Sequence, residues 1–187
     1  MFSSQLRNDS RPNKNHGQAL IYGTFVLRLT CSWNKVDDMS LHLPLDPDVE
    51  QRVRASFARQ GLINTLNGKI AHIGLGELHI EAPFDERFTQ QDNFLHAGIV
   101  TALVDSACGY AAYTLMPADS RVLTVEFKVN FIAPAQGERF RAEGHVIKPG
   151  KTLTVCEGKF FTLQASQTLL VAVMQATMIC IRDDQPK

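Results

Sequence analysis

The centre of the 187-residue chain holds one long helical pattern, residues 94–115, and this pattern is apolar on nearly every face. A helix without a polar face has to be enclosed by the rest of the protein. The chain after it has strand-like patterns in four segments, at 122–132, 139–148, 152–163 and 169–181. In the first of these Val125, Phe127 and Val129 alternate with polar residues, which is the period of a strand. Because no β–α–β alternation appears, we predict an α+β fold in which an antiparallel sheet of five to six strands curls around one long central helix.

A short N-terminal helix and a hairpin are expected before the central helix. Asp46 or Asp48 can cap a helix that runs to about Gln60, and Gly61 is expected to end it. Two alternating segments, 69–73 and 77–82, flank a Gly-Leu-Gly turn, which is typical of a β-hairpin.

Composition places the chain among globular proteins. Apolar residues make up 44% and charged residues 20%, enough for a core without disulfides or a structural metal. The 19 basic and 19 acidic residues cancel, which argues against binding nucleic acid or an anionic membrane by bulk charge. The four cysteines are widely separated, as in proteins of the reducing cytosol. No apolar run is long enough to cross a membrane as a helix, so we expect a cytoplasmic protein.

The first part of the chain differs from the rest, and we expect a basic, disordered extension over residues 1–38 and a single domain over residues 39–187. The extension has five basic and three acidic residues, so its net charge is +2 against −2 for the remaining 149 residues. An apolar run at 19–27 follows basic residues, as in a signal peptide, but Arg28 interrupts it and no small-residue cleavage site follows. Translated upstream sequence ahead of a start at Met39 is the other interpretation.

One ionisable residue lies on a small-residue face of the central helix. Gly98, Ala102, Asp105, Gly109 and Ala112 are three or four residues apart and therefore share one face. Such a face lets a sheet, a second subunit or a bound chain approach the helix closely. Removing a carboxylate from water is costly unless it is well paired. Asp105 therefore either accepts hydrogen bonds that fix the packing or serves in chemistry.

The start of this helix is a second candidate feature. Its first N–H groups have no helical partners and lie at the positive end of the helix dipole. Ala97 and Gly98 are small enough to let a carbonyl oxygen approach, so the turn could hold an oxyanion; the alternative is an ordinary helix entry. Ser106 and Cys108 lack a nucleophile elbow and an evident partner histidine, so we expect both to be small core residues.

Three groups of motifs occur in order along the chain: FTQQDNFLHAG at 88–98, LVDSA with GYA at 103–111, and TVEF, NF, APA and GKT between 124 and 152. Together they resemble the signature of PaaI-like acyl-CoA thioesterases of the hotdog fold. The resemblance covers roughly residues 48–181. An H-x-G motif with an acid nine residues after its histidine and a downstream F-x-x-P-A is fairly specific for this family and less so for its substrate.

The resemblance implies a helix inside the curled sheet and an active site at a dimer interface. By this resemblance Asp105 is the general base or nucleophile, and the Ala97 N–H polarises the thioester carbonyl. Gln90 helps to place the thioester or the water, and Thr124 supports the water from the partner subunit. His96 is expected to contact the neighbouring backbone rather than to act as a base.

The chain departs from the usual His-Gly-Gly of the family at Ala97. Alanine keeps the N–H, but a positive φ there would strain it by roughly 1 kcal/mol or more. The candidate substrate-binding residues near the helix start are Gln91, Asn93, Phe94 and Gly98. The candidate cations for the phosphates of CoA are Arg121, Lys148 and Lys151.

The expected partners are an acyl-CoA substrate and further copies of the chain. The last strand, 169–181, is nearly all apolar and should be buried on both faces, which with the small-residue helix face suggests a homodimer or homotetramer. We expect no cofactor, since CoA arrives with the substrate. The histidines show no metal-ligand spacing along the sequence, so metal catalysis is not expected.

Thioester hydrolysis to a free acid and CoA is the leading hypothesis, and two others stay open. A hotdog hydratase would pair a histidine with an acid, but His96 and Asp105 are nine residues apart and point about 180° from each other around the helix. A non-catalytic acyl-CoA-binding protein is the third. A regulator of that kind would need an added DNA-binding domain, and the first 47 residues contain no helix-turn-helix pattern.

Overall fold

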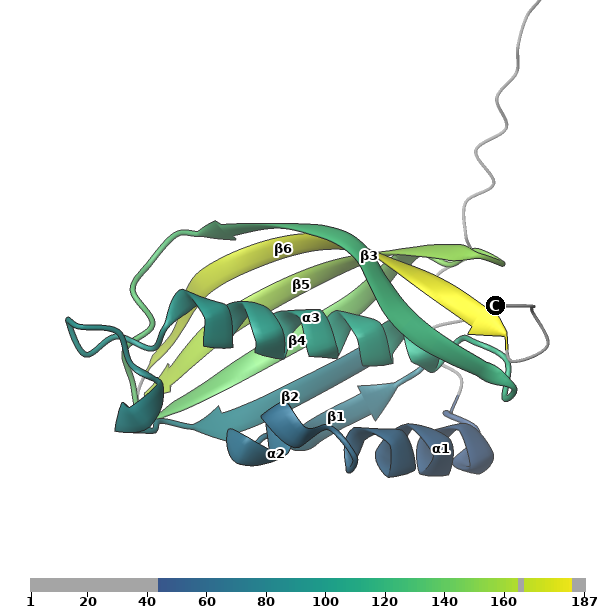
Figure 1. Ribbon diagram of the computed structural model, residues 1–187, viewed down its shortest axis with the longest axis horizontal. Coiled ribbons are helices and arrows are strands. Elements are labelled where there is room, and N and C mark those ends of the chain that lie inside the picture. The colour runs from purple at the N-terminus through teal and green to yellow at the C-terminus, as the bar shows by residue number, and fades with distance from the viewer. Residues whose placement is uncertain (1–43, 165–166, 183–187) are drawn as a thin grey trace, which may run out of the picture. The chain divides into compact units, whose positions relative to one another are not determined.

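The computed structural model describes residues 44–164 and 167–182 (Figure 1). Two helices, α1 (Pro47–Phe57) and α2 (Gly61–Thr65), precede a hairpin of β1 (Lys69–Gly74) and β2 (Glu77–Pro83). A 3-10 turn, η2 (Glu86–Phe88), leads to the central helix α3 (Ala97–Tyr113). The remaining strands are β3 (Ser120–Phe131), β4 (Arg139–Lys148), β5 (Leu153–Gln164) and β6 (Gln167–Arg182).

The six strands form one antiparallel sheet in the order β1-β2-β4-β5-β6-β3. Figure 1 shows this sheet curling around α3. The helix packs closely against all strands except β1. Strand β3 follows α3 in sequence and pairs with β6 at one edge of the sheet. The predicted α+β fold, with a curled sheet wrapped around one long helix, is confirmed.

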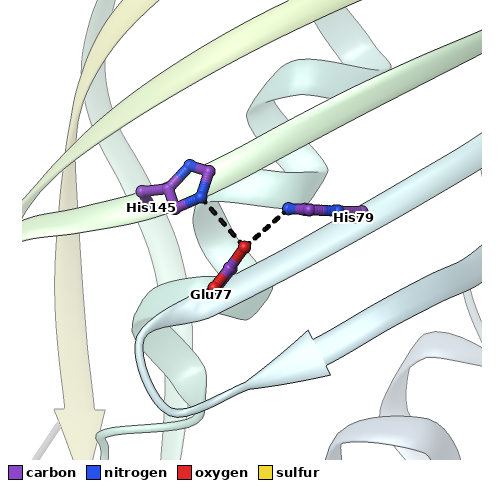
Figure 2. A group of neighbouring side chains, drawn as sticks. All are labelled: Glu77, His79 and His145. Carbon is purple, nitrogen blue, oxygen red and sulfur yellow. Dashed lines mark hydrogen bonds and ion pairs between the residues drawn. The ribbon is translucent and has the colours of Figure 1, made fainter. Parts of the chain in front are cut away.

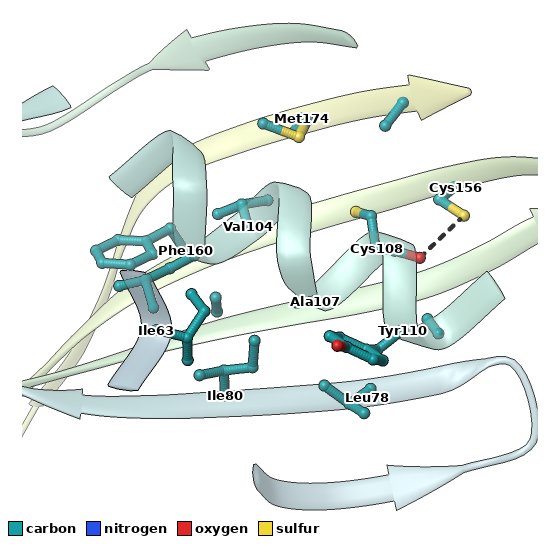
Figure 3. Packing of buried hydrophobic residues seen from close by; sticks show 14 of the residues in the cluster. Ile63, Leu78, Ile80, Val104, Ala107, Cys108, Tyr110, Cys156, Phe160 and Met174 are labelled. Atoms are coloured by element: carbon teal, nitrogen blue, oxygen red, sulfur yellow. Dashed lines mark hydrogen bonds between the residues drawn. The ribbon is translucent and has the colours of Figure 1, made fainter. Parts of the chain in front are cut away.

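The core lies between α3 and the inner face of the sheet (Figure 3). Two strand glycines allow the helix to lie close to the sheet. A β-carbon at Gly144 would overlap the backbone of Ala107 and Cys108, and one at Gly158 would overlap the side chains of Val104 and Cys108. The small residues of α3 that face β4 and β5 therefore serve packing.

Arg52 ties α1 to the end of α3. Its guanidinium donates hydrogen bonds to the carbonyl oxygens of Tyr113 (3.0 Å), Met116 (2.8 Å) and Pro117. Tyr113 is the last residue of α3, and Met116 and Pro117 lie in the turn that follows it. A cation at this end of a helix complements the helix dipole. This contact holds α1 beside the C-terminal half of α3.

The predicted end of the first helix is wrong in detail. α1 begins after Asp46, whose side chain accepts a hydrogen bond from the Asp48 N–H, but it ends at Phe57. Gly61 begins α2 instead of closing α1, because Gln60 before it is extended (φ −74°, ψ 102°) and redirects the chain.

The expectation that the last strand is buried on both faces is wrong for the described chain. Ala172, Met174 and Met178 of β6 face the core, whereas Leu169 and Gln175 are exposed. The reason is that the sheet has a helical layer on one face alone, so the other face of β6 stays open.

Edge strand β3 carries large apolar side chains that the described chain does not cover. Leu123, Val125 and Phe127 are 56%, 53% and 43% exposed. An apolar edge strand of this kind is typical of a surface that associates with another chain.

The predicted extension over residues 1–38 and its boundary at Met39 lie outside the described residues. Within residues 44–164 and 167–182, none of the helices is long and apolar enough to cross a lipid bilayer.

Candidate active site

Asp105 lies at the middle of α3, on the wall of a pocket of about 490 Å³. Ala102 and Gly109 are the small residues of α3 that line this pocket, and a β-carbon at Gly109 would meet no atom within 4 Å. The remaining lining residues are Ser56, Arg59, Gln60, Leu62, Ser106, Tyr110, Tyr113, Arg121, Val122, Leu123 and Thr124. The small-residue face of α3 therefore leaves room beside the carboxylate.

The Asp105 carboxylate is half-buried and has one hydrogen-bond donor in the described structure. Thr124 Oγ1 on β3 donates to Asp105 Oδ1 over 2.8 Å. Burial raises the pKa of Asp105 above its ordinary value, and the hydrogen bond from Thr124 opposes part of that rise. A carboxylate with a raised pKa is a stronger base than one in water, which suits proton abstraction.

The structure corrects the expected origin of the Thr124 hydroxyl. The resemblance implies that this hydroxyl comes from the partner subunit, but here Thr124 and Asp105 belong to the same chain. β3 begins only a short loop after α3 and runs back along it, which brings position 124 opposite position 105.

A second pocket, of about 400 Å³, surrounds the start of α3. It brings together four residues that the sequence singled out near this turn: Gln90, Gln91, Phe94 and Ala97. His96 also lines it. Asn93, by contrast, is exposed in the preceding turn and has a positive φ of 64°.

His96 has a structural part in this turn. Its Nδ1 accepts a hydrogen bond from the Gly98 N–H over 2.9 Å, so His96 is the N-cap of α3. This explains why the helix begins at Ala97 and not at residue 94. A ring nitrogen that accepts from the backbone is not available as a base at the same time.

Ala97 is the first residue of α3, where a backbone N–H has no partner within a helix. Among the described residues other than glycine, positive φ occurs only at Asn67 and Asn93. The departure from glycine at position 97 therefore causes no backbone strain, and its N–H can still meet an oxyanion.

The two pockets do not bring Asp105 and Ala97 together in one chain. The residues are eight positions apart on α3, which is about 12 Å along a helix axis. The nine-residue separation of His96 and Asp105 likewise keeps these two side chains from acting on one substrate atom within a single chain. Within one chain, Asp105 and the Ala97 N–H therefore do not face the same substrate atom.

Ser106 and Cys108, which follow Asp105 closely in sequence, lie in different surroundings. Cys108 is fully buried, and burial raises the pKa of its thiol well above the ordinary value, so it is an unreactive core residue as predicted. Ser106 is not a core residue: it lines the Asp105 pocket, and its hydroxyl donates to Gln60 Oε1 over 3.4 Å.

The candidate cations come from the start of β3 and from the turn that follows β4. Arg121 lines the Asp105 pocket from the start of β3. Lys148 ends β4 and Lys151 lies in the following turn, and both are exposed. This turn adjoins the end of β6 that pairs with β3, since the Cys180 N–H donates to the Thr152 carbonyl oxygen over 2.8 Å. All three cations therefore lie at the same end of the sheet.

Sequence reasoning missed one wall of the Asp105 pocket. Ser56, Arg59, Gln60 and Leu62 come from α1, α2 and the link between them. No local pattern marks these residues as part of a site, because only the docking of α1 through Arg52 places them beside α3.

Comparison with known proteins agrees with this geometry. The thioesterase superfamily matches residues 92–168, which include α3, Asp105 and Thr124. A thioesterase family protein from Silicibacter pomeroyi is 46% identical; the match covers 72% of this chain and 98% of that protein, with a TM-score of 0.71.

Two further solved structures share the fold. A mutant of a thioesterase enzyme from Staphylococcus aureus is 26% identical; the match covers 64% of this chain and 97% of that protein, with a TM-score of 0.59. The Escherichia coli PaaI protein, from the phenylacetic acid degradation operon, is 17% identical over 73% of this chain and 96% of its own, with a TM-score of 0.66. At that identity it shows the fold alone. The chain therefore belongs to the thioesterase superfamily and has the hotdog fold of the PaaI-like proteins.

Proposed function

We propose that this protein is an acyl-CoA thioesterase in which Asp105 is the general base or the nucleophile. The observation that carries the proposal is the half-buried Asp105 carboxylate, hydrogen-bonded to Thr124 on the wall of a pocket. Its raised pKa supports the role, because a base is most effective when its pKa approaches the working pH.

In the general-base route, Asp105 takes a proton from water as the water oxygen attacks the thioester carbonyl. The Ala97 N–H stabilises the oxyanion that forms, at the positive end of α3. Collapse of this intermediate breaks the C–S bond, and the CoA thiolate takes the proton that Asp105 received from water. CoA and the free acid then leave, and Asp105 is again a carboxylate. In the covalent route Asp105 attacks the carbonyl itself, the C–S bond breaks and CoA leaves as the thiolate, which takes a proton. Water then hydrolyses the resulting anhydride to the free acid and restores the Asp105 carboxylate.

The proposed site is completed by a second copy of the chain. Two observations support this: Asp105 and Ala97 face different pockets of one chain, and edge strand β3 exposes Leu123, Val125 and Phe127 beside Thr124. Pairing two copies through β3 would cover these side chains and set Asp105 of one copy against Ala97 of the other. A homodimer is the smallest assembly that does so, and a homotetramer would contain two such dimers.

Substrate contacts are proposed for the residues that surround these groups. Gln90 helps to place the thioester or the water, and Gln91 and Phe94 contact the acyl part from the same pocket. Arg121, Lys148 and Lys151 are proposed to meet the phosphates of CoA, and no further cofactor is required. Two mutant structures of the Staphylococcus aureus protein replace a glutamine and a glutamate that are 15 residues apart, the same separation as Gln90 and Asp105.

A panel of acyl-CoA and aryl-CoA thioesters, with a thiol reagent to detect free CoA, tests the proposal. We expect hydrolysis of at least one substrate and a fall in kcat of about 10²- to 10⁴-fold for Asp105→Asn. Asp119→Asn is the matched control, because Asp119 is an exposed acid in the loop before β3. If the Asp105→Asn variant turned over like the control, Asp105 would not be the catalytic acid. Tight binding of acyl-CoA without release of thiol would favour the non-catalytic binding protein.

A further inference from the structure

A cluster of one glutamate and three histidines lies on the face of the sheet opposite α3. Figure 2 shows three of its members, Glu77, His79 and His145. Glu77 and His79 are two residues apart on β2 and therefore point to the same face. Strand pairing sets His145 of β4 opposite Glu77 and His72 of β1 opposite His79. Three strands thus bring together side chains that come from sequence positions up to 73 residues apart.

The cluster points away from the proposed active site. Leu78 and Gly144, which alternate with the cluster residues, face α3, and Leu78 is fully buried. Glu77, His79 and His145 must therefore project from the outer face of the sheet. The thioester chemistry proposed above uses none of them.

The nitrogen atoms converge on one carboxylate. Glu77 Oε1 lies 2.8 Å from His79 Nε2 and 3.1 Å from His145 Nε2, and Glu77 Oε2 lies 3.6 Å from His72 Nε2. The ligand atoms of Glu77, His79 and His145 all lie within 4.8 Å of one another. Ligand atoms about 2.0–2.1 Å from a tetrahedral zinc ion are about 3.3 Å apart, and the separations of the His79 and His145 nitrogens from Glu77 Oε1 lie within about 0.5 Å of that value.

The His79 ring supplies a second indication of a missing partner. Its side chain is 17% exposed, and its Nε2 atom is buried without a hydrogen bond, although Glu77 Oε1 is only 2.8 Å away. The carboxylate oxygen is therefore close to this nitrogen but poorly aligned with it. Buried polar atoms in proteins nearly always have a hydrogen-bond partner, so a nitrogen that has only a poorly aligned carboxylate beside it requires an explanation.

We propose that Glu77, His79 and His145 bind a divalent transition-metal ion of the zinc type, with His72 at the rim as a fourth ligand. Two or three imidazole nitrogens and one carboxylate oxygen are a donor set that suits Zn²⁺ and the neighbouring metals, whereas Ca²⁺ and Mg²⁺ require mostly oxygen. The ion would link β1 and β2 to β4 and so stabilise the hairpin at this edge of the sheet. Binding would be independent of thioester hydrolysis.

Calorimetric titration of the chelator-treated full-length chain with Zn²⁺ tests this proposal, and Co²⁺ absorption reports the ligand geometry. We expect one equivalent of Zn²⁺ per chain and a higher Tm in its presence. Glu77→Gln and His145→Gln should each lower the affinity by at least about 10-fold and remove the increase in Tm. His72→Gln should weaken binding less, because His72 lies at the rim.

Glu81→Gln is the matched control, since Glu81 lies on the same strand and the same face, next to Arg139 and Arg141. It should bind Zn²⁺ like the wild type. Circular dichroism and urea unfolding in chelator establish that each variant folds, and His79→Gln replaces any variant that does not. Absence of Zn²⁺ binding by the wild type, or equal binding by the wild type and both the Glu77→Gln and His145→Gln variants, would overturn the proposal.

Discussion

Thr124 Oγ1, on edge strand β3, donates a hydrogen bond over 2.8 Å to Asp105 Oδ1, at the middle of the enclosed helix α3. This contact joins the one carboxylate on the small-residue face of the helix to a strand whose apolar side chains are exposed. Burial raises the pKa of Asp105, and the hydrogen bond limits the rise by favouring the charged form. The basicity of Asp105 therefore depends on the position of β3.

Replacing Thr124 with valine should shift the pH dependence of hydrolysis. The change removes the hydroxyl at nearly constant volume, so the pKa of Asp105 rises further and the acid limb of the kcat/KM profile moves to higher pH. We also expect a loss in rate of about 10-fold, the value of one hydrogen bond to a charged group. Thr124→Ser, which keeps the hydroxyl, should recover most of the rate and return the acid limb. An unshifted profile in the valine variant would show that Thr124 does not act through the carboxylate.

Removing the charge at position 105 should stabilise the fold near neutral pH. The pKa of Asp105 in the folded chain lies above 3.8, the ordinary value that applies in the unfolded chain. At a pH between these two pKa values, the folded state therefore holds the proton of Asp105 more tightly than the unfolded chain does. The contribution of Asp105 to the free energy of unfolding therefore falls as the pH rises from the unfolded to the folded pKa. We expect Asp105→Asn to have a higher Tm than the wild type at about pH 7, with a difference that shrinks toward about pH 4. A lower Tm for the variant at neutral pH would mean that the Thr124 hydrogen bond outweighs the cost of burial.

The Ala97 N–H can be removed without breaking the helix. Ala97 is the first residue of α3, a position that accepts proline, and His96 before it is already extended (φ −60°, ψ 136°). Ala97→Pro should therefore lower kcat by about 10²- to 10³-fold, as expected for the loss of one oxyanion donor, with little change in Tm. Ala97→Gly keeps the N–H and should stay far more active than the proline variant. Full activity in Ala97→Pro would exclude the proposed oxyanion role.

Mixing two inactive variants tests whether the site is shared between copies. An Asp105→Asn chain paired with an Ala97→Pro chain contains one site with both groups intact and one with both replaced. If subunits reassort at random, half of the dimers are mixed, so the mixture should regain about a quarter of wild-type activity. Each variant alone, taken through the same dissociation and reassembly, is the control. A mixture no more active than its components would contradict a shared site.

The approach of α3 to the sheet should depend on Gly144 and not on Gly109. A β-carbon at Gly144 would overlap the backbone of Ala107 and Cys108, so Gly144→Ala should lower the free energy of unfolding by about 1–3 kcal/mol. At Gly109 a β-carbon meets no atom within 4 Å, so Gly109→Ala should keep or raise stability, by up to about 1 kcal/mol. Urea unfolding of the two variants and the wild type compares them. Equal stabilities would mean that the helix can move away from β4.

Local patterns determined much of the fold. The strand periods around β3 to β6 and the hairpin before η2 were predicted to within a few residues, because alternation and turn residues are properties of short segments. The enclosed helix was also predicted, and its true start at Ala97 differs because the His96 side chain caps the backbone. Asp105 was recognisable as a candidate since an acid on a small-residue face is visible in the sequence alone.

Tertiary structure decided which residues meet. Thr124 lies opposite Asp105, Gln60 forms a pocket wall and His145 faces Glu77 because strand register and helix docking join segments far apart in sequence. The exposed outer face of β6 has the same origin, since burial depends on which layers cover a sheet and not on how apolar a strand is. Local sequence patterns thus predict the helices and strands and the candidate acid. The surroundings of that acid and the histidine cluster arise from tertiary structure, because both depend on contacts across the sheet that no local pattern encodes.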